Sequence, residues 1–281
     1  AAAAFAKEVN VGQNIDIASD GDVYNILLIG SDTRNGWYGN SDSMILASIN
    51  SQTKTIYMTS FMRDLYANIP NVGIRKLNSA YAVGGGPLLV STIESNYRVD
   101  IDNYASVDFS SMASIIDMVG GVDLEVSTQE AGYINMYLDE QCRLQGLNAS
   151  DYYVAGGGIT HLNGNQAVGF ARIRYTSRGN EHSDYGRTSR QREILVQLMQ
   201  KARSLDATTL LAVVNNMLPL ITHNIDPATL TTLIANAPSY INYDIQTDRI
   251  PYDGLYSSLG EELVPDFEAT INRLHQTIYG N

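Results

Sequence analysis

The sequence predicts one α/β domain, with a mixed central β-sheet of parallel and antiparallel strands and helices on both faces. Three observations support this fold class. Short β-branched apolar runs, such as Val23–Ile29, close on glycine or on polar loops, as buried strands do. The segments 44–50 and 55–61 are joined by a turn so short that an antiparallel hairpin is expected. Stretches with helical spacing of apolar residues, such as 109–119, alternate with further strands.

The other elements are assigned from the same signals. A short helix opening at 76–81 is stopped by Gly84–Gly86, and a second helix is expected over 87–97. Residues 1–21 are polar and irregular and are expected to form an N-terminal arm or lead-in, with one domain over 22–281. Further strands are expected at 103–108, 122–126 and 243–250. Further helices are expected at 133–147, 163–172, 185–205, 207–219, 226–236 and 265–278.

Composition limits the classes of function. The 281 residues carry 18 Lys and Arg against 30 Asp and Glu, for a net charge of −12. Such an acidic chain is unsuited to general nucleic-acid binding, which depends on neutralising many phosphates. Cys142 is the single cysteine, so no internal disulfide can form. No run of about 18 apolar residues occurs, so no membrane-spanning segment is expected.

The segment from Ala171 to Arg192 concentrates the positive charge of this acidic chain. It holds six of the 18 basic residues, all arginines. Arginine presents a rigid fork of donors that pairs with phosphate oxygens and remains charged when partly buried. The segment therefore indicates a pocket for a phosphorylated anion, although a solvated basic helix face is the alternative. The arginines are Arg172, Arg174, Arg178, Arg187, Arg190 and Arg192.

The spacing divides these arginines into groups. If the helix ends near Arg172 and the chain then straightens, Arg172 and Arg174 point to the same side. Arg187, Arg190 and Gln191 share one helix face near the positive end of the next helix, where phosphate binds well. Solvent exposure is expected for the other two members of the segment, Arg178 and Arg192.

Two carboxylates flank the loop that follows the first strand. Asp32 and Asp42 could hold Mg²⁺, which prefers one or two carboxylates together with phosphate oxygens and water. Taken singly and on spacing alone, each is better explained as a turn-forming residue. The four histidines lack ligand spacing, so a zinc site is not expected.

These blocks together resemble the LytR–CpsA–Psr (LCP) family of bacterial cell-envelope proteins. The resemblance covers nearly the whole chain, and its most specific part is R-x-R-Y followed by D-x-x-R-x-x-R-Q. The matching blocks are NILLIGSDTR (25–34), NSDSMILASIN (40–50), TSFMRDLYANIP (59–70), KLNSAYAVGGG (76–86), DNYASVDFSSMASIIDMVGGVDLEV (102–126) and GITHLNGNQAVGFARIRYTSRGNEHSDYGRTSRQRE (158–193).

The resemblance implies a membrane-anchored enzyme whose catalytic domain, residues 22–281, lies on the extracytoplasmic face of the membrane, at the cell wall. Its activity would transfer a glycopolymer from a polyprenyl-diphosphate carrier to peptidoglycan, with Mg²⁺ or Mn²⁺ as cofactor and no nucleic acid as partner. The anchor would lie on the N-terminal side of residue 1. Asp32 and Asp42 would hold the metal, with Asp184 a third candidate. The residues implied to act in catalysis are Asp32, Asp42, Arg63, Arg172 and Arg174. Those implied to bind the diphosphate are Arg34, Arg63, Lys76, Arg172, Arg174, Arg187, Arg190 and Gln191.

Departures from the family pattern keep other functions open. Asn40 stands where the family often has Arg, Phe61-Met62 precede Arg63-Asp64 where it often has Ile-Pro, and the loop 175–184 is atypical. Residues 127–158 match none of these blocks and are expected to shape specificity. A Mg²⁺-dependent polyprenyl-diphosphate hydrolase would use the same groups with water as the acceptor. A non-catalytic lipid-binding or polysaccharide-binding regulator is the third hypothesis.

Overall fold

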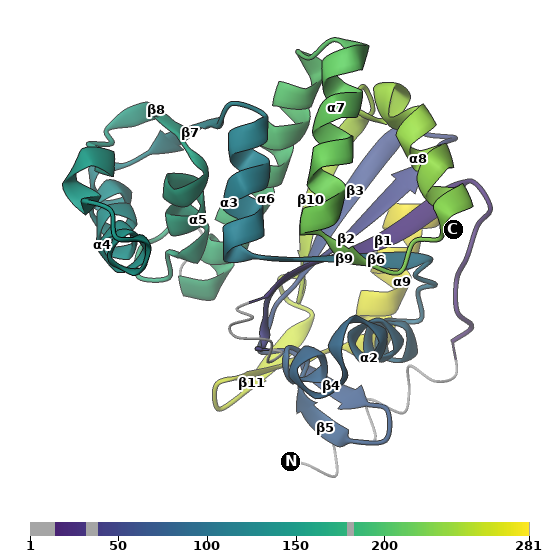
Figure 1. Cartoon of the computed structure of the whole chain (residues 1–281). Coiled ribbons are helices and arrows are strands. Elements are labelled where there is room, and N and C mark those ends of the chain that lie inside the picture. Colours follow the sequence, from purple (N-terminus) through teal and green to yellow (C-terminus); the bar gives the residue numbers. More distant parts are fainter. Residues whose placement is uncertain (1–14, 32–38, 179–182, 281) are drawn as a thin grey trace. The chain divides into compact units, whose positions relative to one another are not determined.

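The computed structural model describes residues 15–31, 39–178 and 183–280, and Figure 1 shows the course of the chain. The strands are β1 (Val23–Ser31), β2 (Ser41–Asn50), β3 (Thr55–Phe61), β4 (Tyr66–Ile69), β5 (Gly73–Lys76), β6 (Asn103–Asp108), β7 (Val122–Val126), β8 (Gly158–Leu162), β9 (Thr222–His223), β10 (Asp244–Ile250), β11 (Tyr256–Leu259) and β12 (Glu262–Pro265). The helices are α2 (Ser79–Tyr97), α3 (Phe109–Met118), α4 (Thr128–Gln145), α5 (Gly164–Arg172), α6 (Ser183–Arg203), α7 (Ala207–Met217), α8 (Pro227–Tyr240) and α9 (Phe267–Tyr279), with 3₁₀ turns η2 (Ala149–Tyr152) and η3 (Leu218–Leu220).

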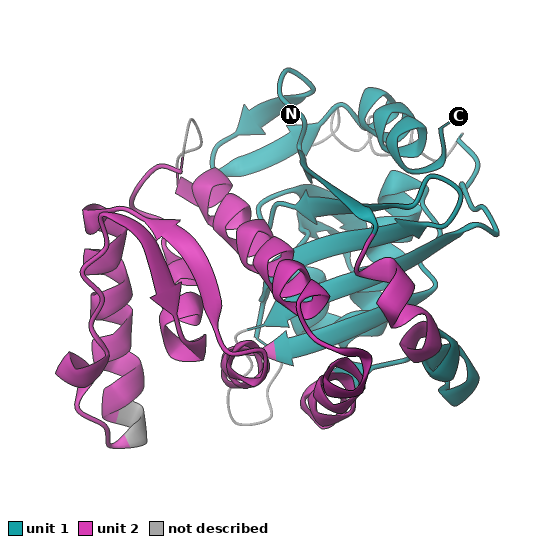
Figure 2. Cartoon of the chain, turned by 90° about the horizontal axis from the view of Figure 1, so that it is seen from above, with its two compact units in different colours: residues 1–107, 222–232, 243–281 teal, residues 108–221, 233–242 magenta. Residues whose placement is uncertain are grey.

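The contacts of the chain fall into two compact units, coloured separately in Figure 2. Unit 1 comprises residues 1–107, 222–232 and 243–281, and unit 2 comprises residues 108–221 and 233–242. Each unit is therefore assembled from segments that are distant in sequence. The assignment of 22–281 as one catalytic domain stays a prediction.

A six-stranded sheet in the order β10-β3-β2-β1-β6-β9 forms the centre of unit 1. The pairs β1–β2 and β2–β3 are antiparallel, whereas β10 lies parallel to β3. The expected hairpin is confirmed, with Asn50 opposite Thr55 at its turn. The predicted α/β class with a mixed central sheet is thus confirmed.

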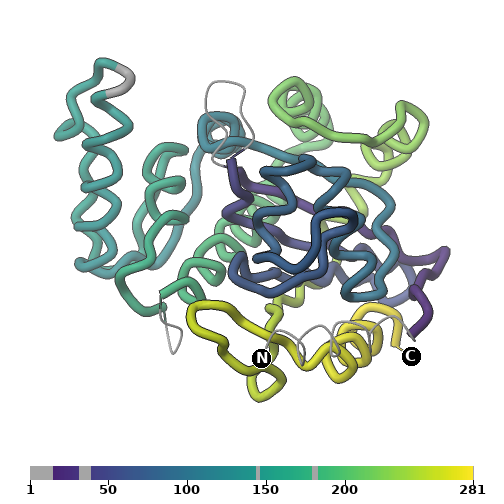
Figure 3. The backbone as a smooth tube through the Cα atoms, turned by 90° about the horizontal axis from the view of Figure 1, so that it is seen from below, coloured from purple at the N-terminus to yellow at the C-terminus, as the bar shows by residue number. Residues whose placement is uncertain are grey.

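Helices α2 and α9 pack against this sheet and against each other. Figure 3 shows the backbone of the chain from below, with α9 in yellow. Every second residue of β1 is buried, because side chains alternate between the faces of a strand. Tyr97 of α2 stacks edge-on against Phe61 of β3 at 4.9 Å and lies 5.8 Å from Phe267 of α9. These aromatic contacts join both helices to the sheet. The expectation that helices also cover the other face of the sheet stays a prediction.

Unit 2 is built around the antiparallel strand pair β7–β8 and helices α3 to α6. Helix α5 packs on both α4 and α6, and apolar side chains of the three helices form a common core. At Gly164 the start of α5 approaches α3 so closely that a Cβ there would lie 2.0 Å from the Ala113 carbonyl oxygen. The fully buried members of this core include Ile116, Val122, Val126, Ile134, Leu138, Leu162, Ala167, Phe170 and Ile173.

The expected elements agree well with the structure. The predicted break between two helices appears as non-helical geometry at Gly84 and Gly85 inside α2. The helix expected over 163–172 is α5, in which Ala167, Val168 and Phe170 are buried. Strands β4, β5, β8, β9, β11 and β12 were not expected from the sequence, because each has only two to five residues and little alternation. None of the described helices is long and apolar enough to cross a membrane.

Candidate functional site

The site residues of unit 1 lie at three strand ends. Asp42 is the second residue of β2, Arg63 follows β3, and Lys76 ends β5. The guanidinium of Arg63 lies 3.6 Å from Asp42 and 3.4 Å from the carboxylate of Asp64. Lys76 Nζ donates to Asp64 Oδ1 at 2.9 Å. Asp64 therefore links Arg63 and Lys76, two of the predicted cations of this unit.

The backbone holds these strand ends together. Asn78 N donates to the Arg63 carbonyl at 3.3 Å, and Ser41 Oγ donates to the Asn78 carbonyl at 3.4 Å. The hydrogen bond to Asp64 is the largest cause that raises the pKa of Lys76, so this amine stays charged at neutral pH. Two further predicted site residues, Asp32 and Arg34, lie outside the described residues.

Helix α5 delivers Arg172 to the site of unit 2. A capping box between Asn163 and Gln166 starts this helix, and Ile173 turns extended, with φ −62° and ψ 128°, directly after Arg172. The predicted straightening of the chain is confirmed. The boundary places Arg172 on the last helical turn and Arg174 in the extended segment.

Aromatic rings fix the orientation of Arg172. Its guanidinium carbon lies 4.6 Å from the ring centre of Tyr137 and 5.0 Å from that of Phe109. The Tyr137 hydroxyl donates to the Arg172 carbonyl at 3.1 Å, and Glu140 lies 3.6 Å from Nη2. Stacking of this kind holds the plane of a guanidinium while its N–H groups point outward in that plane. The rings of Tyr137 and Phe109 thus hold the guanidinium of Arg172 in place.

Asp184 joins two other predicted arginines. Its Oδ1 lies 3.7 Å from Arg174 Nε and 3.5 Å from Arg187 Nε. Arg187 is 2% exposed, whereas about a third of the Arg174 side chain is accessible. The carboxylate of Asp184 thus lies between the guanidinium groups of Arg174 and Arg187 and brings the two arginines together. These ion pairs account for the position of Asp184 beside the two arginines. A role of Asp184 as a metal ligand stays a prediction.

Arg190 has a different environment from the other predicted diphosphate ligands. It is fully buried, and its Nε donates to Glu130 Oε1 at 2.9 Å. Its Nη1 and Nη2 donate to the carbonyls of Ile173, Thr176 and Ser177 at 3.1–3.2 Å. These bonds fasten the segment that carries Arg174 to α6. Arg190 is therefore placed to support the arginine segment from inside unit 2, and direct contact with a diphosphate remains only a prediction.

The expectation that Arg178 and Arg192 are solvent exposed is wrong. Arg192 is buried, and Arg178 Nε donates to Glu193 Oε1 at 2.9 Å. Arg178 Nη1 also donates to Glu130 Oε2 at 3.3 Å. Two acidic partners, Glu130 and Glu193, thus draw Arg178 inward, since a buried charge needs a partner.

Burial alone would raise the pKa of Glu130, but its hydrogen bonds from Ser127 and Arg190 more than offset that effect. The pKa of this carboxyl is therefore lowered below its ordinary value. Glu130 also closes the capping box of α4 with Ser127. One carboxylate consequently supports both the start of α4 and the arginine segment.

The structure thus brings Arg174, Asp184 and Arg187 together, and Asp42 and Arg63 together. Gln191 is half-buried on α6. Sequence reasoning missed several residues that contact the predicted set. For Tyr137 one signal was available, because Tyr133 and Tyr137 are spaced i, i+4 and therefore share a face of α4. The missed residues are Asp64, Phe109, Glu130, Tyr137 and Glu140.

A magnesium ion would find part of a suitable donor set in unit 1. Asp42 supplies a carboxylate beside the Arg63 cation, the arrangement expected where metal and arginine share a diphosphate. Over residues 15–31, 39–178 and 183–280, no three His, Cys, Asp or Glu side chains gather around one point. Asp42 therefore fits as one protein ligand of an ion that would take other ligands from phosphate oxygens and water.

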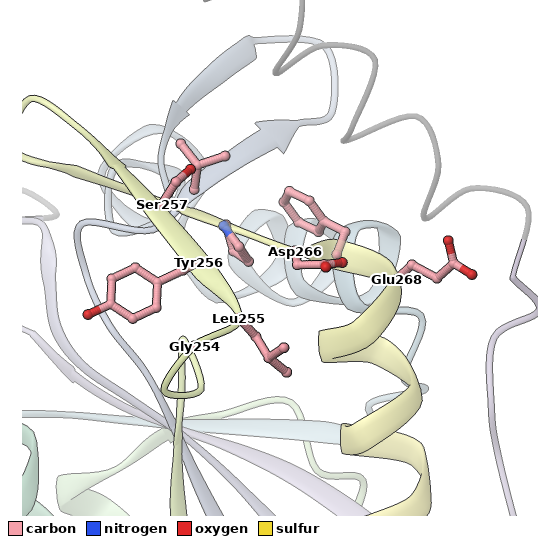
Figure 4. A pocket seen from close by; sticks show the side chains of 9 residues that line it. Gly254, Leu255, Tyr256, Ser257, Asp266 and Glu268 are labelled. Atoms are coloured by element: carbon pink, nitrogen blue, oxygen red, sulfur yellow. The ribbon is translucent and has the colours of Figure 1, made fainter.

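A hollow of about 440 Å³ lies in unit 1 between the β11–β12 hairpin and the start of α9 (Figure 4). Its lining includes Asp266, which caps α9 by accepting from the Ala269 N–H at 3.1 Å. Among the residues that the structure describes, no predicted site residue lines this hollow. It is therefore separate from the candidate site. The lining residues are Gly254, Leu255, Tyr256, Ser257, Val264, Pro265, Asp266, Phe267 and Glu268.

The chain is thus a mixed α/β protein with arginines gathered around a carboxylate, and comparison with known proteins identifies its family. The LytR_cpsA_psr family model matches residues 2–272. This chain belongs to the LytR–CpsA–Psr family.

Individual relatives support this assignment. The chain is 33% identical over 287 residues to the polyisoprenyl-teichoic acid–peptidoglycan teichoic acid transferase TagU of Oceanobacillus iheyensis, covering 98% of this chain and 79% of the relative. It is also 33% identical over 199 residues to the regulatory protein MsrR of Staphylococcus aureus, covering 70% of this chain. The match spans about half of that relative's length, 54%.

Solved structures show the same fold. TagT bound to LIIa-WTA superposes with a TM-score of 0.70, covering 94% of each chain at 22% identity. A structure of YwtF (TagT) with bound octaprenyl pyrophosphate gives a TM-score of 0.65, covering 96% of each chain at 21% identity. At these identities the likeness establishes the fold and not the ligand.

Proposed function

We propose that this chain is a glycopolymer phosphotransferase, which moves a glycan from a polyprenyl-diphosphate carrier to peptidoglycan at the extracytoplasmic face of the membrane. The observation that carries the proposal is the pairing of Arg174 and Arg187 through Asp184, beside the stacked Arg172. Three oriented guanidinium groups with one carboxylate form a compact site for a multiply charged anion. The name of TagU and the ligands bound in the TagT structures point to the same class of substrate.

The chemistry follows from where charge develops. An acceptor hydroxyl oxygen forms a bond to the phosphorus that carries the glycan, and the bond from this phosphorus to the bridging oxygen breaks. Polyprenyl monophosphate leaves with the electron pair of that bond. Arginine donors placed against these oxygens stabilise the growing charge, and each is typically worth ~10²–10³ in rate.

The roles of the carboxylates follow from their neighbours. Asp42, beside Arg63, fits as a Mg²⁺ ligand together with Asp32, and Mn²⁺ suits the same oxygen donors. The bound ion would neutralise charge on the diphosphate oxygens. Either aspartate is also a candidate to take the proton of the acceptor hydroxyl. A membrane anchor on the N-terminal side of residue 1 would keep the protein beside its lipid substrate.

Reconstituted transfer tests the proposal. Protein, Mg²⁺, a polyprenyl-diphosphate-linked glycan and peptidoglycan fragments should yield glycan bound to peptidoglycan through a phosphodiester, together with polyprenyl monophosphate. Release of the lipid phosphate at the same rate without an acceptor would identify a hydrolase instead. Tight lipid binding without any product would identify a non-catalytic binding protein.

A further inference from the structure

Tyr133 and Tyr175 form a surface feature of unit 2 that the proposed phosphate chemistry does not use. Tyr175 is 68% exposed, and its ring lies 5.8 Å from that of Tyr133 at an interplanar angle of 35°. An aromatic side chain this exposed contributes little to a core. The pair is therefore available to contact a ligand.

The pair continues the aromatic contacts of the candidate site. Tyr133 precedes Tyr137 by one turn of α4, so both project from the same face of the helix. Tyr137 in turn stacks on the guanidinium of Arg172 at 4.6 Å, and Tyr175 directly follows Arg174 in the chain. Aromatic rings thus extend outward from the arginines that are proposed to hold the diphosphate.

The surroundings of the pair favour a saccharide over a lipid tail. Thr176, next to Tyr175, donates its hydroxyl to Gln129 Oε1 at 3.0 Å on the exposed surface. A polyprenyl chain requires an apolar enclosure, whereas a sugar ring combines C–H faces, which stack on aromatic rings, with hydroxyls, which need polar partners. Because the first sugar is bonded to the diphosphate, it must lie next to the arginines.

We propose that Tyr133 and Tyr175 form a platform on which the first sugar of the lipid-linked glycan stacks. This inference rests on the proposed function and deepens it, since it assigns recognition of the sugar to α4 and to the segment after Arg174. The pair distinguishes a glycan-bearing diphosphate lipid from a bare one. Its members are specificity residues and take no part in bond breaking.

Binding measurements on two lipids test the platform. The full chain is titrated with octaprenyl diphosphate and with octaprenyl diphosphate that carries one N-acetylglucosamine. We expect Tyr133→Ala and Tyr175→Ala to weaken binding of the sugar-bearing lipid about tenfold and to leave binding of the bare lipid unchanged. Tyr175→Trp should restore the lost affinity, because it restores an aromatic face.

Tyr153→Ala is the matched control, since Tyr153 is 48% exposed in the same unit and donates instead to Asp139. It should bind both lipids as the wild type does. Equal affinity of the wild type for the two lipids, or equal losses for both lipids in the alanine variants, would overturn the platform and leave the proposed function standing. A wild type that binds neither lipid would refute the proposed function, and the platform with it.

Discussion

Arg190 and Glu130 are 60 residues apart in sequence, yet the guanidinium Nε of one donates to the carboxylate Oε1 of the other at 2.9 Å in the interior of unit 2. The remaining donors of Arg190 hold carbonyls of the segment between α5 and α6. This pair therefore joins α4, α6 and the arginine segment, and its loss should affect both folding and activity.

Breaking this pair should destabilise the protein in a pH-dependent way. Glu130→Gln is expected to lower the free energy of unfolding by about 3–5 kcal/mol at pH 7, because it leaves a buried guanidinium without its counter-charge. The folded-state pKa of Glu130 lies below the ordinary value of 4.5, so the carboxylate contributes its stability above about pH 4.5. The difference in the free energy of unfolding between the wild type and Glu130→Gln should therefore become smaller as the pH falls through the folded-state pKa of Glu130. Urea unfolding across the pH range 3–7 measures this deficit.

The double variant Glu130→Gln/Arg190→Leu provides the control for the ion pair. The double variant should lose less free energy of unfolding than the sum of the losses in Glu130→Gln and Arg190→Leu. A deficit in Glu130→Gln that is constant across the pH range would contradict the assignment.

Removing either of two oriented arginines should abolish most of the transfer. Arg172→Ala and Arg187→Ala are each expected to lower kcat/KM by ~10²–10³, because each removes a donor to the charge that develops on the diphosphate. The reconstituted transfer assay gives the rate, and circular dichroism verifies the fold. Arg143→Ala changes an exposed arginine in the last turn of α4 and should be without effect. Wild-type turnover in both variants would show that the site is elsewhere.

Metal removal should stop the reaction. EDTA is expected to abolish transfer, and added Mg²⁺ or Mn²⁺ to restore it, if the ion neutralises diphosphate charge. Asp42→Asn should then require a higher Mg²⁺ concentration for half-maximal activity, because a ligand charge is lost. Asp253→Asn, at a largely exposed position in unit 1, is the control and should respond as the wild type does. Activity that is unaffected by EDTA would eliminate the metal from the proposal.

Two glycines in unit 2 should respond oppositely to alanine. Gly164→Ala forces a Cβ to within 2.0 Å of the Ala113 carbonyl oxygen and is expected to lower the free energy of unfolding by about 1–3 kcal/mol. Gly132→Ala, in α4 with no neighbouring atom within 4 Å of the new Cβ, should raise it by about 0.5–1 kcal/mol. Chemical denaturation of both variants measures the difference. Equal effects would argue against the close packing of α3 and α5.

Local sequence signals predicted much of the fold. The strand 55–61 and the helix ending at Arg172 coincide with β3 and α5, because β-branched runs and a capping box act over a few residues. Strands such as β4 and β9 could not be predicted, since their pairing depends on partners rather than on their own pattern. The division into two units likewise leaves no mark in composition.

The candidate site shows the same limit. The arginines and Asp42 were recognisable because charges cluster in sequence or follow strands. Their partners were not, since Glu130 lies 60 residues before Arg190, and Phe109 lies far before Arg172. The expectation that Arg178 is exposed was wrong for the same reason. Its burial depends on ion pairs with Glu130 and Glu193, which its own segment does not reveal.

The position of Arg172 between Phe109 and Tyr137 has a consequence for ionic strength. Dissolved salt screens the attraction between accessible charges, such as those of Arg174 and Asp184, over a distance of about 8–10 Å. Contact between a guanidinium and flanking rings that exclude water is screened far less. As the salt concentration rises, Arg172 should thus keep its orientation after the Arg174–Asp184 ion pair has weakened. At high salt, an anionic ligand would then still bind to one correctly oriented arginine.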